Sequence, residues 1–96
     1  MGSLRQLHAV IRGRVQGVGF RYNAQAKAQR LSLGGWVRNL ADGAVETLAV
    51  GPQDALENYL NWLRKGPSGA HVAAVDAEWN DSLQSFPSFE IRYGSE

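Results

Sequence analysis

The stretch that decides the fold is Ile11-Arg12-Gly13-Arg14-Val15-Gln16-Gly17-Val18-Gly19-Phe20-Arg21. It changes from the alternating pattern of a strand into a loop rich in glycine, and then directly into a helix pattern. Gly13, Gly17 and Gly19 permit positive φ and a close approach of the backbone to a ligand. A helix start presents N–H groups without intrahelical partners, together with roughly half a positive charge. The stretch therefore predicts an anion site that suits a phosphate group.

Arg21 adds a side chain whose geometry matches phosphate. A guanidinium fork donates to two phosphate oxygens at once, and such charge-assisted bonds are roughly twice as strong as neutral ones. Three other phosphate motifs are excluded. The chain has no Gly-Lys-Ser or Gly-Lys-Thr of a Walker loop, Tyr22 stands where a dinucleotide loop has its third glycine, and there is no cysteine to serve as a phosphatase nucleophile. Water is then the simplest attacking group.

Length and composition limit the class of protein. A chain of 96 residues predicts one domain over residues 1–96, with a two-layer fold. The absence of cysteine removes disulfides and thiolate metal sites, and His8 and His71 are too few and too far apart in sequence to predict a metal centre. Neither a membrane span nor a signal peptide is evident. We therefore expect a cytoplasmic monomer without cofactor, metal or membrane attachment.

Charge is distributed unevenly along the chain, although the net charge is only +1. Residues 1–41 contain seven basic and no acidic residues, whereas residues 42–96 contain three basic and nine acidic residues. One interpretation is a local positive potential that attracts a small anion. Another is a chance segregation of charges on solvated faces. A nucleic-acid surface ranks lower, because the strands lack the exposed paired aromatics of a base-stacking sheet.

The remaining elements follow from hydrophobic periodicity and turn signals. Strands are predicted at 7–11, 36–40, 44–50, 75–79 and 89–93, and helices at 22–33 and 52–65. Gly34-Gly35 is expected to end the first helix, and Asp42-Gly43 is a strong hairpin signal. The order βαββαβ with a short fifth strand predicts an α+β, ferredoxin-like sandwich. Its sheet is antiparallel-rich and carries two helices on one face.

Asn39 lies near the end of the second predicted strand. From the residues alone, the favoured interpretation is a turn-flanking asparagine that bonds local backbone. Arg38 points to the opposite face of a regular strand, so it is not assigned to the site. Tyr22 has two open roles, either lining the site or packing in a partly buried position beside the loop.

Two motifs in the chain resemble those of the acylphosphatase family. The first consists of Gly13, Val15, Gln16, Gly17, Val18, Phe20 and Arg21, and the second of residues 35–39 with Gly43, Val45 and Gly51. The resemblance continues through residues 66–70 to Phe89-Glu90-Ile91, which covers nearly the whole chain. One departure is Ser32, where many members have glycine. It affects the end of the first helix and leaves the chemistry untouched.

The resemblance implies a metal-independent hydrolase that cleaves acyl phosphates to carboxylate and inorganic phosphate. It assigns phosphate binding to Arg21 and to the loop amides of Gln16, Gly17, Val18, Gly19 and Phe20. It also reverses the interpretation of Asn39, which then orients the attacking water. The implied partner is a small acyl phosphate, with inorganic phosphate or sulfate as competing anions and no nucleic acid.

The chemistry of an acyl phosphate is consistent with so short a list of residues. Its carboxylate leaving group departs without a strong general acid, so positioning and electrostatics remain as the requirements. Asparagine does not act as a base, and a phosphate oxygen of the substrate is the hypothetical proton acceptor.

Three non-catalytic alternatives stay open. They are an anion- or small-molecule-sensing module, a nucleic-acid-binding module, and the first unit of a larger carbamoyl-phosphate-handling protein. The last is disfavoured because the chain begins just before its first strand and stops just after its fifth.

Overall fold

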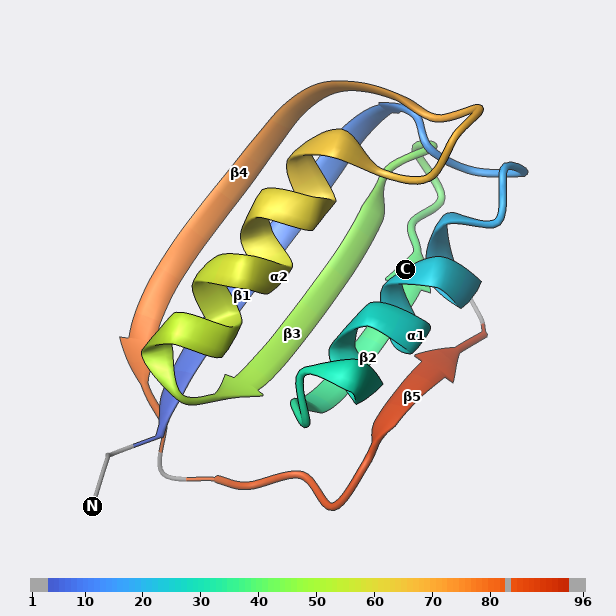
Figure 1. Ribbon diagram of the computed structural model, residues 1–96. Helices are drawn as coiled ribbons and strands as arrows, with labels where there is room; N and C mark the ends of the chain where they lie inside the picture. The colour runs from blue at the N-terminus through green and yellow to red at the C-terminus, as the bar shows by residue number, and fades with distance from the viewer. Residues whose placement is uncertain (1–3, 83, 94–96) are drawn as a thin grey trace.

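The computed structural model describes residues 4–82 and 84–93. Its elements in chain order are β1 (Arg5–Arg14), α1 (Phe20–Arg30), β2 (Gly34–Asn39), β3 (Val45–Gly51), α2 (Gln53–Lys65), β4 (His71–Asp81) and β5 (Phe89–Arg92). The strands form one sheet in the order β4-β1-β3-β2-β5, and both helices cover the same face of it (Figure 1). The predicted ferredoxin-like α+β sandwich is confirmed. Within the described ranges, neither helix is long and apolar enough to cross a membrane.

Strand β1 is an interior strand of the sheet, between β4 and β3, and its pairing with β4 continues beyond its pairing with β3. Its antiparallel ladder with β3 ends at the pair Ile11↔Val45, whereas its ladder with β4 continues to Arg14↔His71. The register shifts between Arg12 and Gly13. β2 also pairs antiparallel with β3, while β5 pairs parallel with β2. The last part of β1 is therefore joined to β4 alone as it enters the loop before α1.

The core lies between the sheet and the two helices. Leu7, Ala9 and Ile11 of β1 are fully buried, as the sequence alternation predicts. Helix α1 contributes small side chains, and α2 contributes larger ones; the buried residues are Phe20, Ala24 and Ala28 in α1, with Leu56, Tyr59, Leu60 and Leu63 in α2. The small alanines allow α1 to lie close to the sheet.

One polar pair lies inside this core. The hydroxyl of Thr47 on β3 donates to the carbonyl of Trp36 at 2.8 Å and lies 2.9 Å from the phenol oxygen of Tyr59 on α2. Burial raises the pKa of Tyr59, although the hydrogen bond with Thr47 opposes this effect. The phenol therefore stays neutral and joins α2 to the sheet by a satisfied hydrogen bond.

Helix α1 ends earlier than the sequence predicts. It was expected to continue to about Leu33, but it ends at Arg30 because Ser32 adopts a left-handed φ of 58°. The N–H of Leu33 donates to Ala28 O at 2.9 Å, and the N–H of Ser32 donates to Gln29 O at 3.0 Å. These two bonds form a Schellman motif with serine at the position that usually holds glycine.

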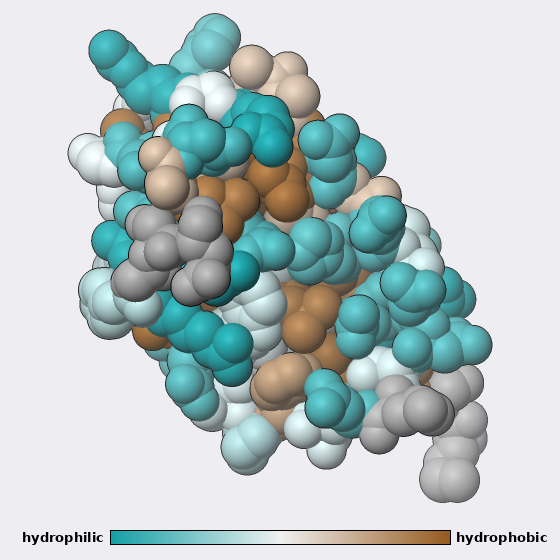
Figure 2. All heavy atoms as spheres, turned by 180° about the vertical axis from the view of Figure 1, so that it is seen from behind, coloured by the Kyte–Doolittle hydropathy of each residue, from teal (hydrophilic) through white to brown (hydrophobic). Residues whose placement is uncertain are grey.

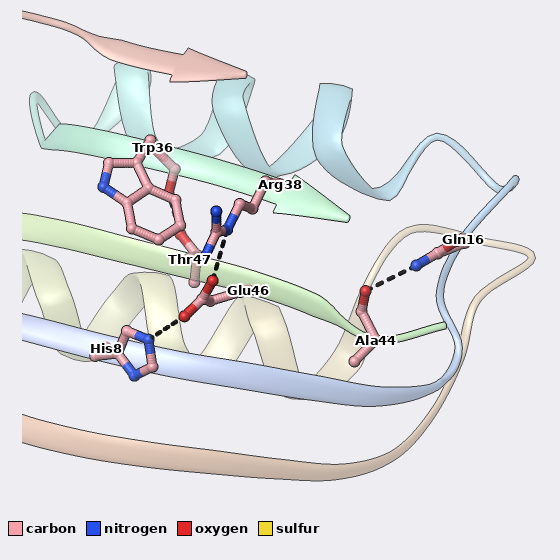
Figure 3. A network of polar contacts seen from close by, with 7 residues as sticks. All are labelled: His8, Gln16, Trp36, Arg38, Ala44, Glu46 and Thr47. Carbon is pink, nitrogen blue, oxygen red and sulfur yellow. Dashed lines mark hydrogen bonds and ion pairs between the residues drawn. The ribbon is translucent and has the colours of Figure 1, made fainter. Parts of the chain in front are cut away.

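The other face of the sheet carries no helix and presents apolar patches separated by polar side chains (Figure 2). On this face Glu46 accepts a hydrogen bond from Arg38 at 2.7 Å and lies 2.6 Å from Nε2 of His8 (Figure 3). Burial tends to raise the pKa of Glu46, but the hydrogen bonds with His8 and Arg38 outweigh it and hold the pKa below its usual value. The guanidinium groups of Arg38 and Arg92 lie 5.2 Å and 4.9 Å from the ring centroid of Trp36. Arg38 thus points to the face opposite the helices, as expected.

Candidate active site

The loop between β1 and α1 has the backbone that an anion cradle needs. Gly17 and Gly19 adopt φ values of 77° and 76°, in the left-handed region that glycine favours. A Cβ on Gly17 would meet nothing within 4 Å, and one on Gly19 only Asn23 Nδ2 at 3.4 Å. Backbone conformation, rather than crowding, therefore explains glycine at both positions. Turns of this kind bring successive N–H groups into a concave anion site.

Helix α1 begins directly at this loop, with its positive end free of acidic side chains. Gly19 is the N-cap residue and supplies no side-chain cap, and the first turn of α1 contains no acidic residue. Lys27 and Arg30 lie in the last turn, where positive charge is favourable. Asn23 donates from its side chain to the carbonyl of Gly19 at 2.8 Å, which fixes the junction of loop and helix. A bound anion would complete the N-terminus of α1.

A cavity of about 210 Å³ opens where the loop, α1, β2 and the end of β5 converge. Its lining residues are Val15, Gly17, Gly19, Phe20, Arg21, Tyr22, Asn39, Ile91 and Tyr93. Arg21 and Asn39 therefore open into one cavity, although they lie in different elements. Of the described residues that line it, only Arg21 is charged, and none is a carboxylate or a histidine. The cavity suits an anion.

The predicted phosphate-binding residues divide into two groups. Gly17, Gly19, Phe20 and Arg21 line the cavity, but the side chain of Phe20 is buried against Trp62, with ring centroids 5.3 Å apart. The ring of Phe20 thus packs in the core, although the residue also lines the cavity. Gln16 and Val18 are not among the lining residues. The side chain of Gln16 instead donates to Leu40 O and Ala44 O, each at 2.8 Å.

Three lining residues were missed or left open by the sequence. Tyr22 is 70% exposed and lines the cavity, so the partly buried role considered for it is wrong. Ile91 and Tyr93 were expected only as strand residues. The guanidinium carbon of Arg21 lies 5.1 Å from the Tyr93 ring centroid, a cation–π distance. The alternation of Phe89, Ile91 and Tyr93 was visible in the sequence, but the parallel pairing of β5 with β2 was not.

The described part of the chain offers no cluster of side chains suited to a metal ion. In residues 4–82 and 84–93, no three His, Cys, Asp or Glu side chains lie close enough together to hold a metal ion. Among the described residues, the groups at the cavity that could hold an anion are Arg21, the loop amides and the start of α1.

The fold and cavity together define a ferredoxin-like protein with a cavity suited to an anion at the start of its first helix. The family model for acylphosphatase matches residues 7–91. The acylphosphatase of Acaryochloris marina is 51% identical over 85 residues, which cover 88% of this chain and 90% of the relative. The chain belongs to the acylphosphatase family.

Solved structures agree with this assignment. The crystal structure of acylphosphatase from Bacillus subtilis superposes with a TM-score of 0.90 at 39% identity, covering 93% of this chain and 99% of that one. Full-length HypF, in its phosphate- and nucleotide-bound form, gives a TM-score of 0.88 at 25% identity. That match covers 99% of this chain but only 12% of HypF. The same architecture is thus found both as a short protein and as one part of a much longer one.

Proposed function

We propose that this protein hydrolyses the carboxyl–phosphate bond of acyl phosphates, releasing carboxylate and inorganic phosphate. The observation that carries the proposal is the convergence of the left-handed glycine loop, Arg21 and Asn39 on one cavity in a chain of the acylphosphatase family. We propose further that it acts as a cytoplasmic monomer, without metal, cofactor or nucleic acid.

The phosphoryl group binds to the backbone amides of residues 16–20 and to the guanidinium of Arg21. Both come from one continuous segment, the loop and the first turn of α1, so they form a single binding unit. The ring of Tyr93 keeps the guanidinium beside the cavity that both residues line. As charge spreads over the phosphoryl oxygens in the transition state, these donors already lie in place.

Asn39 orients the attacking water. Its amide does not accept a proton near neutral pH, so it aims the water without acting as a base. No carboxylate or histidine lies among the described lining residues, and the proton passes to an oxygen of the substrate phosphate. The carboxylate leaves without protonation because it is a weak base. Alignment and charge stabilisation are therefore the whole catalytic contribution of the protein.

The acyl group meets the apolar and aromatic part of the cavity. Tyr22 and Tyr93 are exposed, and Ile91 of strand β5 lines the cavity together with them. An open wall of this kind accepts acyl groups of several sizes. Inorganic phosphate and sulfate compete for the phosphoryl position because they present the same oxygens to the loop.

The test compares wild type with Asn39→Ala, using acetyl phosphate or benzoyl phosphate and excess chelator. We expect rapid chelator-resistant release of phosphate by wild type, and a loss of about 10²-fold or more in the variant, by analogy with removing one transition-state contact. The variant should still bind inorganic phosphate, and a stable phosphate monoester should not be cleaved. Phosphate binding by wild type without turnover would instead identify a sensing module and refute the proposal.

A further inference from the structure

The side chain of Gln16 holds the phosphate loop against the connection between β2 and β3 (Figure 3). Its Nε2 donates to Ala44 O and to Leu40 O, both at 2.8 Å. Both partners are carbonyl oxygens, so only the NH₂ group of the amide fits here. A flipped amide would place Oε1 against two acceptors. One amide group therefore bridges two backbone carbonyls of the hairpin.

The bridge lies just beyond the point where the ladders of β3 with β1 and with β2 end. The ladder between β1 and β3 ends at Ile11↔Val45, and the ladder between β2 and β3 ends at Asn39↔Val45. Leu40 and Ala44 are the next facing pair, joined by the bond from Leu40 N–H to Ala44 O at 2.8 Å. Beyond the last β1–β3 pair, the side chain of Gln16 thus supplies hydrogen bonds between the loop after β1 and the β2–β3 hairpin.

A second contact crosses the same gap from β1. Arg12 Nη1 lies 2.9 Å from Asp42 Oδ2, and the hydrogen bond and charge of Arg12 hold the pKa of Asp42 below its usual value. Both side chains are about half exposed, so this ion pair contributes little rigidity. The two bonds of Gln16, which are partly buried, are the stronger connection.

We propose that Gln16 is a positioning residue, which fixes Asn39 relative to the phosphate loop. This inference rests on the proposed role of Asn39 in aiming the water. Asn39 directly precedes Leu40, whose carbonyl Gln16 holds, whereas the phosphate donors follow Gln16 in its own segment. Loss of the bridge therefore moves the water relative to a phosphoryl group that is still bound. A misplacement of about 1 Å is enough to slow such a reaction about 10²-fold.

The first experiment replaces Gln16 with methionine, which keeps the length of the side chain and removes both donors. We expect kcat to fall about 10- to 100-fold, while the inhibition constant of inorganic phosphate stays within about 3-fold of wild type. Arg12→Met is the matched control, because it removes the exposed contact across the same gap, and its kcat should stay within about 2-fold. Equal losses in kcat and phosphate affinity in Gln16→Met would overturn the proposal.

A double-mutant cycle tests whether Gln16 acts through Asn39. In an Asn39→Ala background, Gln16→Met should lower the residual rate by no more than about 2-fold, because no oriented water remains to be misplaced. If Gln16→Met lowers the rate about 10- to 100-fold both in wild type and in Asn39→Ala, the positioning role of Gln16 is wrong, but the proposed role of Asn39 still stands. A fully active Asn39→Ala would instead show that the assignment of Asn39 itself is wrong. The two failures are thus distinguishable.

Gln16→Glu supplies a readout that a folding defect would not give. An ionised carboxylate donates no hydrogen bond to the two carbonyls, whereas a protonated carboxyl donates one. We expect the kcat of Gln16→Glu, divided by that of wild type, to rise as pH falls toward the ordinary glutamate pKa of about 4.3. The same ratio for Gln16→Met should be flat, and a flat ratio for Gln16→Glu would contradict the bridge.

Discussion

Replacing Ser32 with glycine should stabilise the protein. Ser32 has a φ of 58°, and among the described residues it is the only one other than glycine with a positive φ. It holds this conformation because the N–H groups of Ser32 and Leu33 close the Schellman motif at the end of α1. Its side chain is exposed, so its removal takes away no buried contact.

Two opposing terms determine the size of the effect. A left-handed conformation costs a residue with a Cβ roughly 1–2 kcal/mol. Glycine avoids this cost but loses more backbone freedom on folding, which offsets roughly 0.5–1 kcal/mol. The net gain lies between about 0 and 1.5 kcal/mol, with a midpoint of about 0.75 kcal/mol. For a protein of this size, that midpoint corresponds to a rise in Tm of about 3–6 °C.

Thermal and urea unfolding followed by circular dichroism would measure the change. Gln29→Gly is the matched control, because Gln29 is an exposed helical residue of α1 for which glycine should cost about 1 kcal/mol. The same type of substitution should thus have opposite signs at positions three residues apart. The rate with acetyl phosphate should not change, because Ser32 does not line the cavity. A Tm lowered in both variants would refute the reasoning.

Two further predictions concern charged groups. Arg21→Ala and Arg21→Lys should each lose about 10²- to 10³-fold in kcat/KM with weakened phosphate binding, because a point charge does not reproduce the guanidinium fork. Steady-state kinetics would check this against Arg30→Ala, which removes the same charge at an exposed position and should stay within about 2-fold; a near-normal Arg21→Lys would exclude bidentate recognition. The second prediction follows from the lowered pKa of Glu46, which means that its ionised form stabilises the fold at neutral pH. This contribution is fully present above the ordinary pKa of 4.5 and is lost as pH falls through the lower pKa of the folded state. Wild type should therefore exceed Glu46→Gln in stability at pH 7, with the difference shrinking below about pH 4.5, as urea titrations at several pH values would show; a difference independent of pH would contradict the pairing with His8 and Arg38.

Local patterns explain why much of the fold was predictable. Alternation in β1, the loop glycines and the stripe of α2 each depend on residues close together in sequence. The same logic placed Arg38 on the face away from the helices, because side chains alternate along β2. The left-handed glycines of the loop and the helix start beside them could likewise be predicted without knowledge of the rest of the chain.

Long-range pairing explains what the sequence did not reveal. The contribution of Tyr93 to the cavity depends on β5 lying parallel to β2, and no local pattern specifies that neighbour. The bridge from Gln16 to the hairpin depends on where two ladders end, which is a property of register. The early end of α1 shows a different limit. Ser32 takes a backbone conformation that its residue type disfavours, because the Schellman bonds compensate for it.

The edge position of β5 has a consequence for how the site is assembled during synthesis. During synthesis, the loop after β1 and Asn39 leave the ribosome early. Ile91 and Tyr93, which line the other side of the cavity, emerge only with β5 and the residue after it. Because β3, α2 and β4 separate β5 from β2 in the sequence, the pairing of these two strands is among the long-range contacts of the chain. A nascent chain therefore carries both motifs before it has all the residues that line the cavity.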